Sequence, residues 1–264
     1  MSACPMFNSS SMSENIYEKI VQAEKNDTLS ALCIVTKTHG SAPGRPGMKM
    51  LVYEDGSING TIGGGAIEKE VIDRAIELMA SSTPQYFTFN LKADLNMECG
   101  GGQEVYIEPL NQKRKLFIFG AGHIGKALSH FALTLGFDVT VIDERQGIFQ
   151  DYPESAIKCI NTHFTEAIIN LKPDKRSFFV IVTHKHIHDY DILKQLCVMP
   201  WAYLGMIGSR IKVEKIRKEL VENGIITNET AEAIDMPIGI RFKALTHNEI
   251  AISILAKLID VRNS

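Results

Sequence analysis

A glycine-rich turn at residues 120–125 is the first place where this sequence could do chemistry. Gly120, Gly122 and Gly125 follow the apolar run KLFIF and open a predicted helix, which is the G-x-G-x-x-G arrangement of phosphate-binding turns. Backbone N–H groups without side chains can approach a phosphate closely, and the helix N-terminus adds partial positive charge. Asp143 ends the next predicted strand, near the spacing expected for a ribose contact, and Arg145 leaves the choice between NAD and NADP open. The turn predicts a bound phosphate, with tight packing alone as the alternative.

Three histidines and an aspartate crowd together after the run FFVIVT. His184, His186, His188 and Asp189 fall at the end of a predicted strand, and ligands of open parallel sheets gather at such ends. A spacing of two on an extended segment would place His184 and His186 on one face. These side chains suit zinc or another divalent ion, and they could equally carry protons or donate to a bound anion. A solvated loop with incidental histidines is the alternative.

Two more glycine-rich segments lie nearer the N-terminus. Gly63, Gly64 and Gly65 precede a predicted helix that has Glu68 in its first turn, where its charge suits the helix dipole. Three consecutive glycines predict a close backbone approach, either by a ligand or by a packed part of the protein. Cys99 stands before three further glycines, so it could ligate a soft metal, carry sulfur or form a held thiolate. An unreactive loop cysteine is the alternative.

From residue 115 onward, predicted strands and helices alternate, which indicates a parallel sheet covered on both faces. Ser209 is a candidate helix N-cap after the last of these strands, and Arg210 is a candidate anion contact. Thr246 and Glu249 form a capping box before an apolar final helix. The strands are predicted at 115–120, 138–143, 156–160, 178–183 and 202–207, and the helices at about 123–135, 164–170, 188–198 and 209–222.

The first part of the chain reads differently, as a mixed α+β domain. A capping box of Ser11 and Glu14 predicts a helix over about 13–25. A strand is expected within 28–38, and the segment 50–62 reads as a hairpin that turns at Asp55-Gly56. A helix follows the three glycines, then two strands at 85–91 and 104–110, and a charged linker at 111–115. We therefore expect an α+β domain over 1–111 and a Rossmann-like domain over 115–264.

The overall composition excludes several classes of protein. The chain has 264 residues and a net charge of −3, which gives no reason to expect a nucleic-acid or membrane partner. It has no apolar run of about 20 residues and no signal-peptide pattern at its start, so we expect a cytoplasmic protein. Five widely spaced cysteines argue against a disulfide framework. The apolar final helix makes self-association into a homo-oligomer an expectation.

Several short motifs, in one order, give the sequence a family resemblance. They are GSAPGRPGMKMLV, GTIGGGAIE, CGG, IFGAGHIG, VIVTHKH, YLGMIGSRIK and the final EIAISILAKLI. With them the chain, from about Thr38 to Ile259, resembles the xanthine dehydrogenase accessory proteins of the XdhC/CoxI type. The resemblance implies a maturation chaperone rather than an enzyme. Such a protein binds the molybdenum cofactor (molybdopterin), a pterin dithiolene with a phosphate, and protects it.

The resemblance also implies partners and a ligand-binding set. The partners would be a xanthine-dehydrogenase-type molybdoenzyme, which receives the cofactor, and a cysteine desulfurase. Cys99 would meet the metal through the cofactor. The contacts expected for the cofactor are Gly63, Gly64, Gly65, Glu68, Cys99, Gly120, Gly122, His123, Gly125, Asp143, His184, His186, Ser209 and Arg210.

Two other functions stay open from the residues themselves. An NAD(P)-dependent oxidoreductase would use the glycine-rich turn and would need a proton donor such as His123 or His184. A metal-dependent hydrolase would be built on His184, His186 and Asp189.

Overall fold

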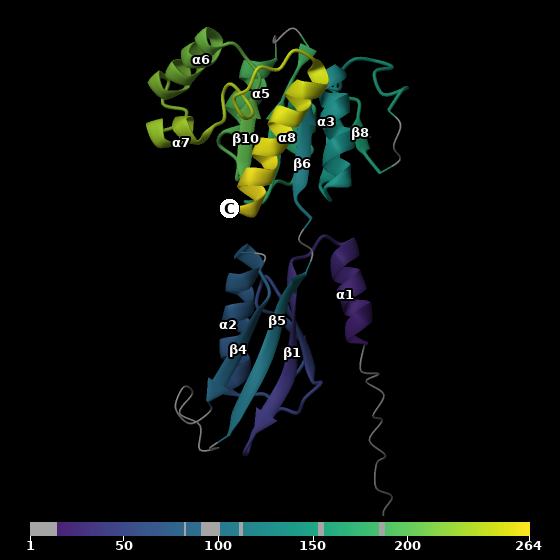
Figure 1. Ribbon diagram of the computed structural model, residues 1–264, viewed down its shortest axis with the longest axis vertical. Coiled ribbons are helices and arrows are strands. Elements are labelled where there is room, and N and C mark those ends of the chain that lie inside the picture. Colours follow the sequence, from purple (N-terminus) through teal and green to yellow (C-terminus); the bar gives the residue numbers. More distant parts are fainter. Residues whose placement is uncertain (1–14, 82, 91–100, 111–112, 153–155, 185–187) are drawn as a thin grey trace, which may run out of the picture. The chain divides into compact units, whose positions relative to one another are not determined.

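The chain divides into two compact units, Met1–Gln112 and Lys113–Ser264 (Figure 1). The computed structural model describes residues 15–81, 83–90, 101–110, 113–152, 156–184 and 188–264. Each unit has its own sheet and its own buried apolar core. Among the described residues, no helix combines the length and the apolar character needed to cross a membrane.

The N-terminal unit is built on a five-stranded antiparallel sheet in the order β3-β2-β1-β5-β4. The hairpin between β2 and β3 turns at Asp55 and Gly56, as the sequence predicts. The backbone of Gly56 has a φ of 80°, and the N–H of Ser57 donates to Asp55 Oδ1 at 2.9 Å. The strands are β1 (Ser30–His39), β2 (Lys49–Tyr53), β3 (Ile58–Gly60), β4 (Gln85–Asn90) and β5 (Gly102–Leu110).

Two helices accompany this sheet. Helix α2 (Ala66–Ser81) follows the three glycines as predicted, and its apolar stripe, which includes Ile67, Val71 and Ala75, is buried in the core of the unit. Helix α1 (Ile16–Lys25) begins later than predicted, because Asn15 is its N-cap and accepts from the N–H of Tyr17 at 3.1 Å. The predicted capping box at residues 11 and 14 lies outside the described residues.

The C-terminal unit has the predicted parallel sheet, in the order β10-β9-β6-β7-β8. Within this unit the chain begins at the central strand, β6, continues outward through β7 to β8, and then crosses to β9 on the other side of β6. This reversal creates a topological switch point beside β6, where ligands of doubly wound sheets bind. The strands are β6 (Lys115–Phe119), β7 (Asp138–Ile142), β8 (Lys158–Ile160), β9 (Phe178–Ile181) and β10 (Tyr203–Met206).

Helices cover both faces of the sheet, and β6 shows why. Its side chains alternate, so that Leu116 and Ile118 pack toward one face while Phe117 and Phe119 pack toward the other. Helices α3 (His123–Thr134) and α8 (His247–Asn263) lie side by side on the first face (Figure 1). The second core is covered by α4 (Phe164–Asn170), α5 (Asp189–Leu196) and α6 (Arg210–Glu222), and α7 (Asn228–Ala233) packs against α6.

Some local expectations need correction. Helix α7 was not predicted, because six residues are too few to show a helical period; its N-cap, Thr227, is the signal that was available. Cys33 is a core residue, and burial raises the pKa of its thiol to about 12. Cys159 is exposed because it lies on the edge strand β8. The apolar face of α8 packs on its own sheet, so it gives no separate reason for self-association.

The N-terminal unit depends on a buried glutamine, which gives a first prediction. Gln103 is fully buried; its Oε1 accepts from the N–H of Gly44 at 3.2 Å, and its Nε2 donates to the carbonyl of Ile62 at 2.9 Å. Gln103→Ala leaves both groups buried without this partner. We expect the free energy of unfolding to fall by about 1–3 kcal/mol in urea titrations followed by circular dichroism. Gln85→Ala, at an exposed position of β4, is the matched control; equal effects from both variants would contradict this role.

Candidate functional site

The three glycines of the turn after β6 have different roles. A Cβ on Gly120 would lie 2.4 Å from the carbonyl oxygen of Val182, and one on Gly125 would lie 1.9 Å from the carbonyl oxygen of Gly120. These two glycines therefore permit close packing of the turn. A Cβ on Gly122 would meet only Arg145 Nη2, at 3.9 Å. The turn thus has a packing role at its ends and open space at its middle glycine, where a phosphate would approach.

Asp143 holds this turn in place. Its side chain is 2% exposed, and its Oδ2 accepts from the N–H of Ala121 at 2.8 Å and from Arg145 Nη2 at 2.7 Å. Its Oδ1 accepts from the backbone N–H and from Nε of Arg145, at 3.0 and 2.9 Å. Burial alone would raise the pKa of this carboxyl, but these hydrogen bonds outweigh burial and leave the pKa below its ordinary value. Both oxygens are therefore occupied, which leaves little of Asp143 for a ribose contact.

Positive charge and free donors meet at the open glycine. The side chain of Arg145 is 36% exposed, and its guanidinium lies next to the space above Gly122. Helix α3 starts at His123, and its N-cap, Gly122, has no side chain to satisfy the first N–H groups of the helix. His123 is exposed and packs its ring against that of His247, with centroids 5.1 Å apart. This corner can bind an anion.

The glycines at 63–65 have a structural explanation within their own unit. All three have positive φ, and a Cβ on Gly63 would lie 2.6 Å from the backbone nitrogen of Gly44. Glu68 Oε1 accepts from the N–H groups of Ile62 and Gly64, at 3.1 and 2.9 Å, and from the hydroxyl of Thr61. Two backbone donors of this loop are therefore bonded to Glu68, and the N–H of Gly63 donates to the hydroxyl oxygen of Thr61. Of the two explanations for three glycines, the geometry favours the packed one.

The histidine cluster differs from its expected arrangement. Strand β9 ends at Ile181, so His184 is an exposed residue beyond the strand, and its expected pairing with His186 falls outside the described residues. Asp189 is fully buried; it accepts from the hydroxyl of Thr183 and from Lys212 Nζ, the latter at 3.0 Å. Its carboxylate therefore joins the end of β9 to α6. Both partners of Asp189 are structural, so the predicted grouping of Asp189 with His184 has no support from this carboxylate.

A hollow of about 120 Å³ lies at the carboxyl ends of these strands. It shares Asp143 and Arg145 with the glycine-rich turn, which places the turn beside the predicted ligand edge of the sheet. Among the described residues, His188, which lines the hollow, contacts Glu144, and Glu144 in turn contacts His163. Glu144 and His163 are not among the site residues predicted from the sequence; their positions just after predicted strands were the available signal. The lining residues are Asp143, Glu144, Arg145, Phe164, Thr183, His184 and His188.

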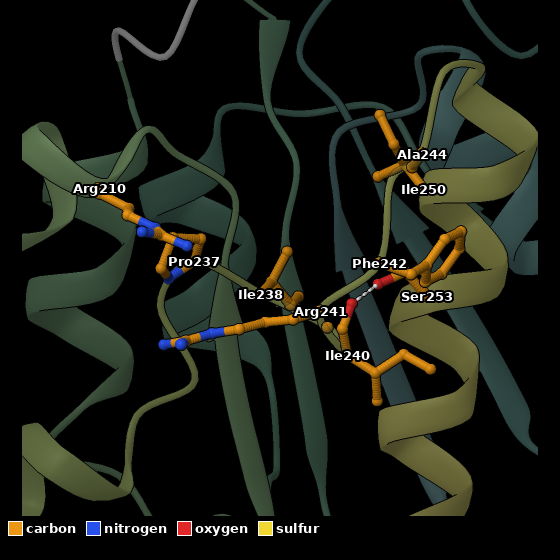
Figure 2. A pocket seen from close by; sticks show the side chains of 10 residues that line it. Arg210, Pro237, Ile238, Ile240, Arg241, Phe242, Ala244, Ile250 and Ser253 are labelled. Carbon is orange, nitrogen blue, oxygen red and sulfur yellow. Dashed lines mark hydrogen bonds between the residues drawn. The ribbon is translucent and has the colours of Figure 1, made fainter.

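Ser209 and Arg210 lie near another hollow, of about 280 Å³ (Figure 2). Ser209 is the N-cap of α6 and accepts from the N–H of Lys212 at 3.3 Å, as predicted. Arg210 and Arg241 lie on the side of Pro237 in Figure 2, opposite apolar residues near α8. Arg210 and Arg241 thus bring positive charge to this hollow, but Arg145 lines a different one. Cys99 lies outside the described residues.

Comparison with known proteins shows the family to which this chain belongs. Residues 116–258 match a family described as the XdhC Rossmann domain, and residues 24–90 match the XdhC and CoxI family. The fold and the turn thus define an α/β protein with a Rossmann-type second unit. The chain belongs to the XdhC and CoxI family.

Individual relatives share about a quarter to a third of their aligned residues with this chain. The chain is 32% identical to the Escherichia coli (strain K12) protein YqeB over 95% of this chain and 47% of that protein. It is 25% identical to a Bacillus subtilis (strain 168) protein named as a probable xanthine dehydrogenase component, over 60% of this chain and 46% of that protein. It is 24% identical to the molybdenum cofactor insertion chaperone PaoD of E. coli (strain K12), over 92% and 86%. The chain spans about half the length of the first two.

One solved structure also matches the chain. A crystal structure described as a xanthine dehydrogenase from Bacillus halodurans matches 92% of this chain and 94% of that one, with 21% identity and a TM-score of 0.49.

The depressed pKa of Asp143 predicts a pH dependence of stability. Because the folded-state pKa is lowered, the contribution of this carboxylate is complete above its ordinary value of 3.8 and is lost as the pH falls through the folded value. At neutral pH we expect Asp143→Asn to lower the free energy of unfolding by about 1–3 kcal/mol. The difference should narrow only below about pH 4. Urea unfolding followed by the fluorescence of Trp201, the one tryptophan, measures it; a difference independent of pH would contradict the ion pair.

Proposed function

We propose that this chain is an accessory protein for molybdoenzymes that binds the molybdenum cofactor through its phosphate at the turn after β6. Membership of the XdhC and CoxI family supports the accessory role, and the relative PaoD is named as a molybdenum cofactor insertion chaperone. The proposed recipient is a molybdoenzyme of the xanthine dehydrogenase type. The observation that carries the proposal is the open space at Gly122 beneath the guanidinium of Arg145.

The residues around this space suit a phosphate. The first N–H groups of α3 point out of the helix without a capping side chain, and Arg145 supplies a charged donor. Asp143 orients that guanidinium through hydrogen bonds of 2.7 and 2.9 Å. When bound, the cofactor supplies the molybdenum and its dithiolene. The protein holds the phosphate and, in this proposal, shields the cofactor until a molybdoenzyme receives it.

The geometry is less suited to the two alternative functions, an NAD(P)-dependent oxidoreductase and a metal-dependent hydrolase. A dinucleotide site of the Rossmann type uses the acid at the end of the second strand to bind a ribose hydroxyl. Here Asp143 accepts four hydrogen bonds, all from Ala121 and Arg145, and a ribose would have to displace some of them. The hydrolase alternative loses its expected carboxylate ligand, because Asp189 is buried against Thr183 and Lys212.

Gly122→Val tests the phosphate position. The backbone at Gly122 is extended, with a φ of −71°, so valine fits without backbone strain, and its side chain fills the space where the phosphate would lie. Since charged hydrogen bonds are worth about 1.5–3 kcal/mol each, we expect cofactor binding to fall more than about tenfold. The molybdenum content and the mass spectrum of the copurifying small molecule measure this, in protein made by a host that synthesises the cofactor.

Thr134→Val is the control for this variant. It introduces the same side chain at an exposed position in the last turn of the same helix, and it should retain the cofactor. A folded Gly122→Val protein with full cofactor content would place the phosphate elsewhere. Copurification of NAD or NADP in place of a pterin would favour the oxidoreductase instead.

Cys99 provides a separate test of how the metal is held. A thiol among glycines can reach a soft metal, and the family resemblance implies such a contact. We expect Cys99→Ala to fold normally and to lose most of the bound molybdenum, with Cys159→Ala, at an exposed cysteine, as the control. Molybdenum content measured after gel filtration decides; equal retention by both variants would remove Cys99 from the site.

A further inference from the structure

Three side chains that the proposed function does not use meet at the carboxyl edge of the parallel sheet. Glu144 follows β7, His163 precedes α4 and His188 precedes α5. His188 Nε2 lies 2.9 Å from Glu144 Oε1, and His163 Nε2 lies 3.5 Å from Glu144 Oε2. One atom of each side chain can be chosen so that all three lie within 4.8 Å of one another. Two imidazoles thus point their Nε2 atoms at the two oxygens of one carboxylate.

Neighbouring groups hold this cluster in place. Asn161 Nδ2 donates to the carbonyl oxygens of Asp143 and Arg145, at 2.7 and 2.9 Å, and so fixes the backbone on both sides of Glu144. The ring of Phe164 packs against that of His188, with centroids 5.5 Å apart. Neither histidine uses its side chain to cap the helix that it precedes. The three donors therefore come from separate strand ends but are positioned by the fold.

We propose that Glu144, His163 and His188 bind a divalent transition-metal ion, with Zn²⁺ as the best fit. Two imidazole nitrogens and a carboxylate form a donor set that zinc accepts, and the spacing is suitable. Ligands bound to zinc at about 2.0–2.1 Å in tetrahedral geometry lie roughly 3.4 Å apart. The two distances from Glu144 to the histidines, 2.9 and 3.5 Å, are close to this value. Three protein ligands leave a position open. Glu144 and His188 also line the hollow of about 120 Å³, so a water or an anionic ligand there could take that position.

This site differs from the metal grouping that the sequence suggests. That grouping used Asp189, which is bonded to Thr183 and Lys212. The new one replaces it with Glu144 and His163, residues that stand 19 positions apart in the sequence and meet only because β7 and β8 are neighbours. The proposal does not depend on cofactor binding, because none of the three residues belongs to the proposed phosphate contacts at Gly122 and Arg145.

Metal titration tests the proposal directly. The full chain is made in a host that lacks the molybdenum cofactor, stripped with a chelator, and titrated with Zn²⁺ by calorimetry. We expect one Zn²⁺ per chain, and Co²⁺ in its place should give a spectrum of nitrogen and oxygen ligands without a thiolate charge-transfer band. Glu144→Gln and His163→Ala should each weaken zinc binding by more than about 100-fold, because even residues that only support a ligand cost 10–100-fold.

Controls separate a built site from incidental binding. The side chains of His163 and Glu144 are 59% and 31% exposed, so both variants should fold, and unchanged fluorescence of Trp201 verifies this. His130→Ala removes an exposed histidine on α3 and should bind zinc as the unaltered protein does. Three results would each overturn the proposal: no stoichiometric zinc, equal affinity in Glu144→Gln and His130→Ala, or a thiolate band with Co²⁺. None of them bears on the result of Gly122→Val.

Discussion

The carboxylate of Asp143 is the constraint on which the C-terminal unit depends. It is almost fully buried at the end of β7, yet it carries a charge that Arg145 and two backbone N–H groups compensate. A buried charge without such partners would be costly, so the turn after β6 and the loop after β7 must lie together. The same bonds aim the guanidinium of Arg145 at the space above Gly122. The interaction that stabilises the turn is thus the one that positions Arg145 for the proposed anion.

The rest of the carboxyl edge follows from sheet order. Because β6 lies between β7 and β9, the loops after all three strands converge there. Asp189 satisfies its buried charge with Lys212 and so attaches α6 to this edge. Glu144 meets two histidines at the same edge. Two groups of residues therefore border one hollow at this edge. One is Arg145, beside the proposed anion position, and the other is the proposed cation cluster of Glu144 and the two histidines.

The N-terminal unit solves a similar problem around its glycines. Its glycine-rich loop leaves several N–H groups without helix or sheet partners, and Glu68 and Gln103 provide most of the bonds that the loop needs. Glu68 acts on its own loop, whereas Gln103 reaches both this loop and Gly44 from β5. A run of glycines that looks like a ligand cradle can thus be a requirement of packing, since the positive φ angles and the close contact at Gly63 are met inside the unit.

The sequence by itself determined most of the secondary structure and the family, because alternating apolar residues, caps at Ser209 and Thr246, and the glycine spacing act locally; the short helix α7 was the exception. It also predicted a glycine-rich turn that opens a helix, since Gly122 and the start of α3 are adjacent in the chain. Only the tertiary structure decided which polar groups remain available. Asp143, Glu68 and Asp189 all look like ligands in the sequence, but partners up to 23 residues away occupy them. The meeting of Glu144 with His163 and His188 depends on strand order, which no local pattern encodes.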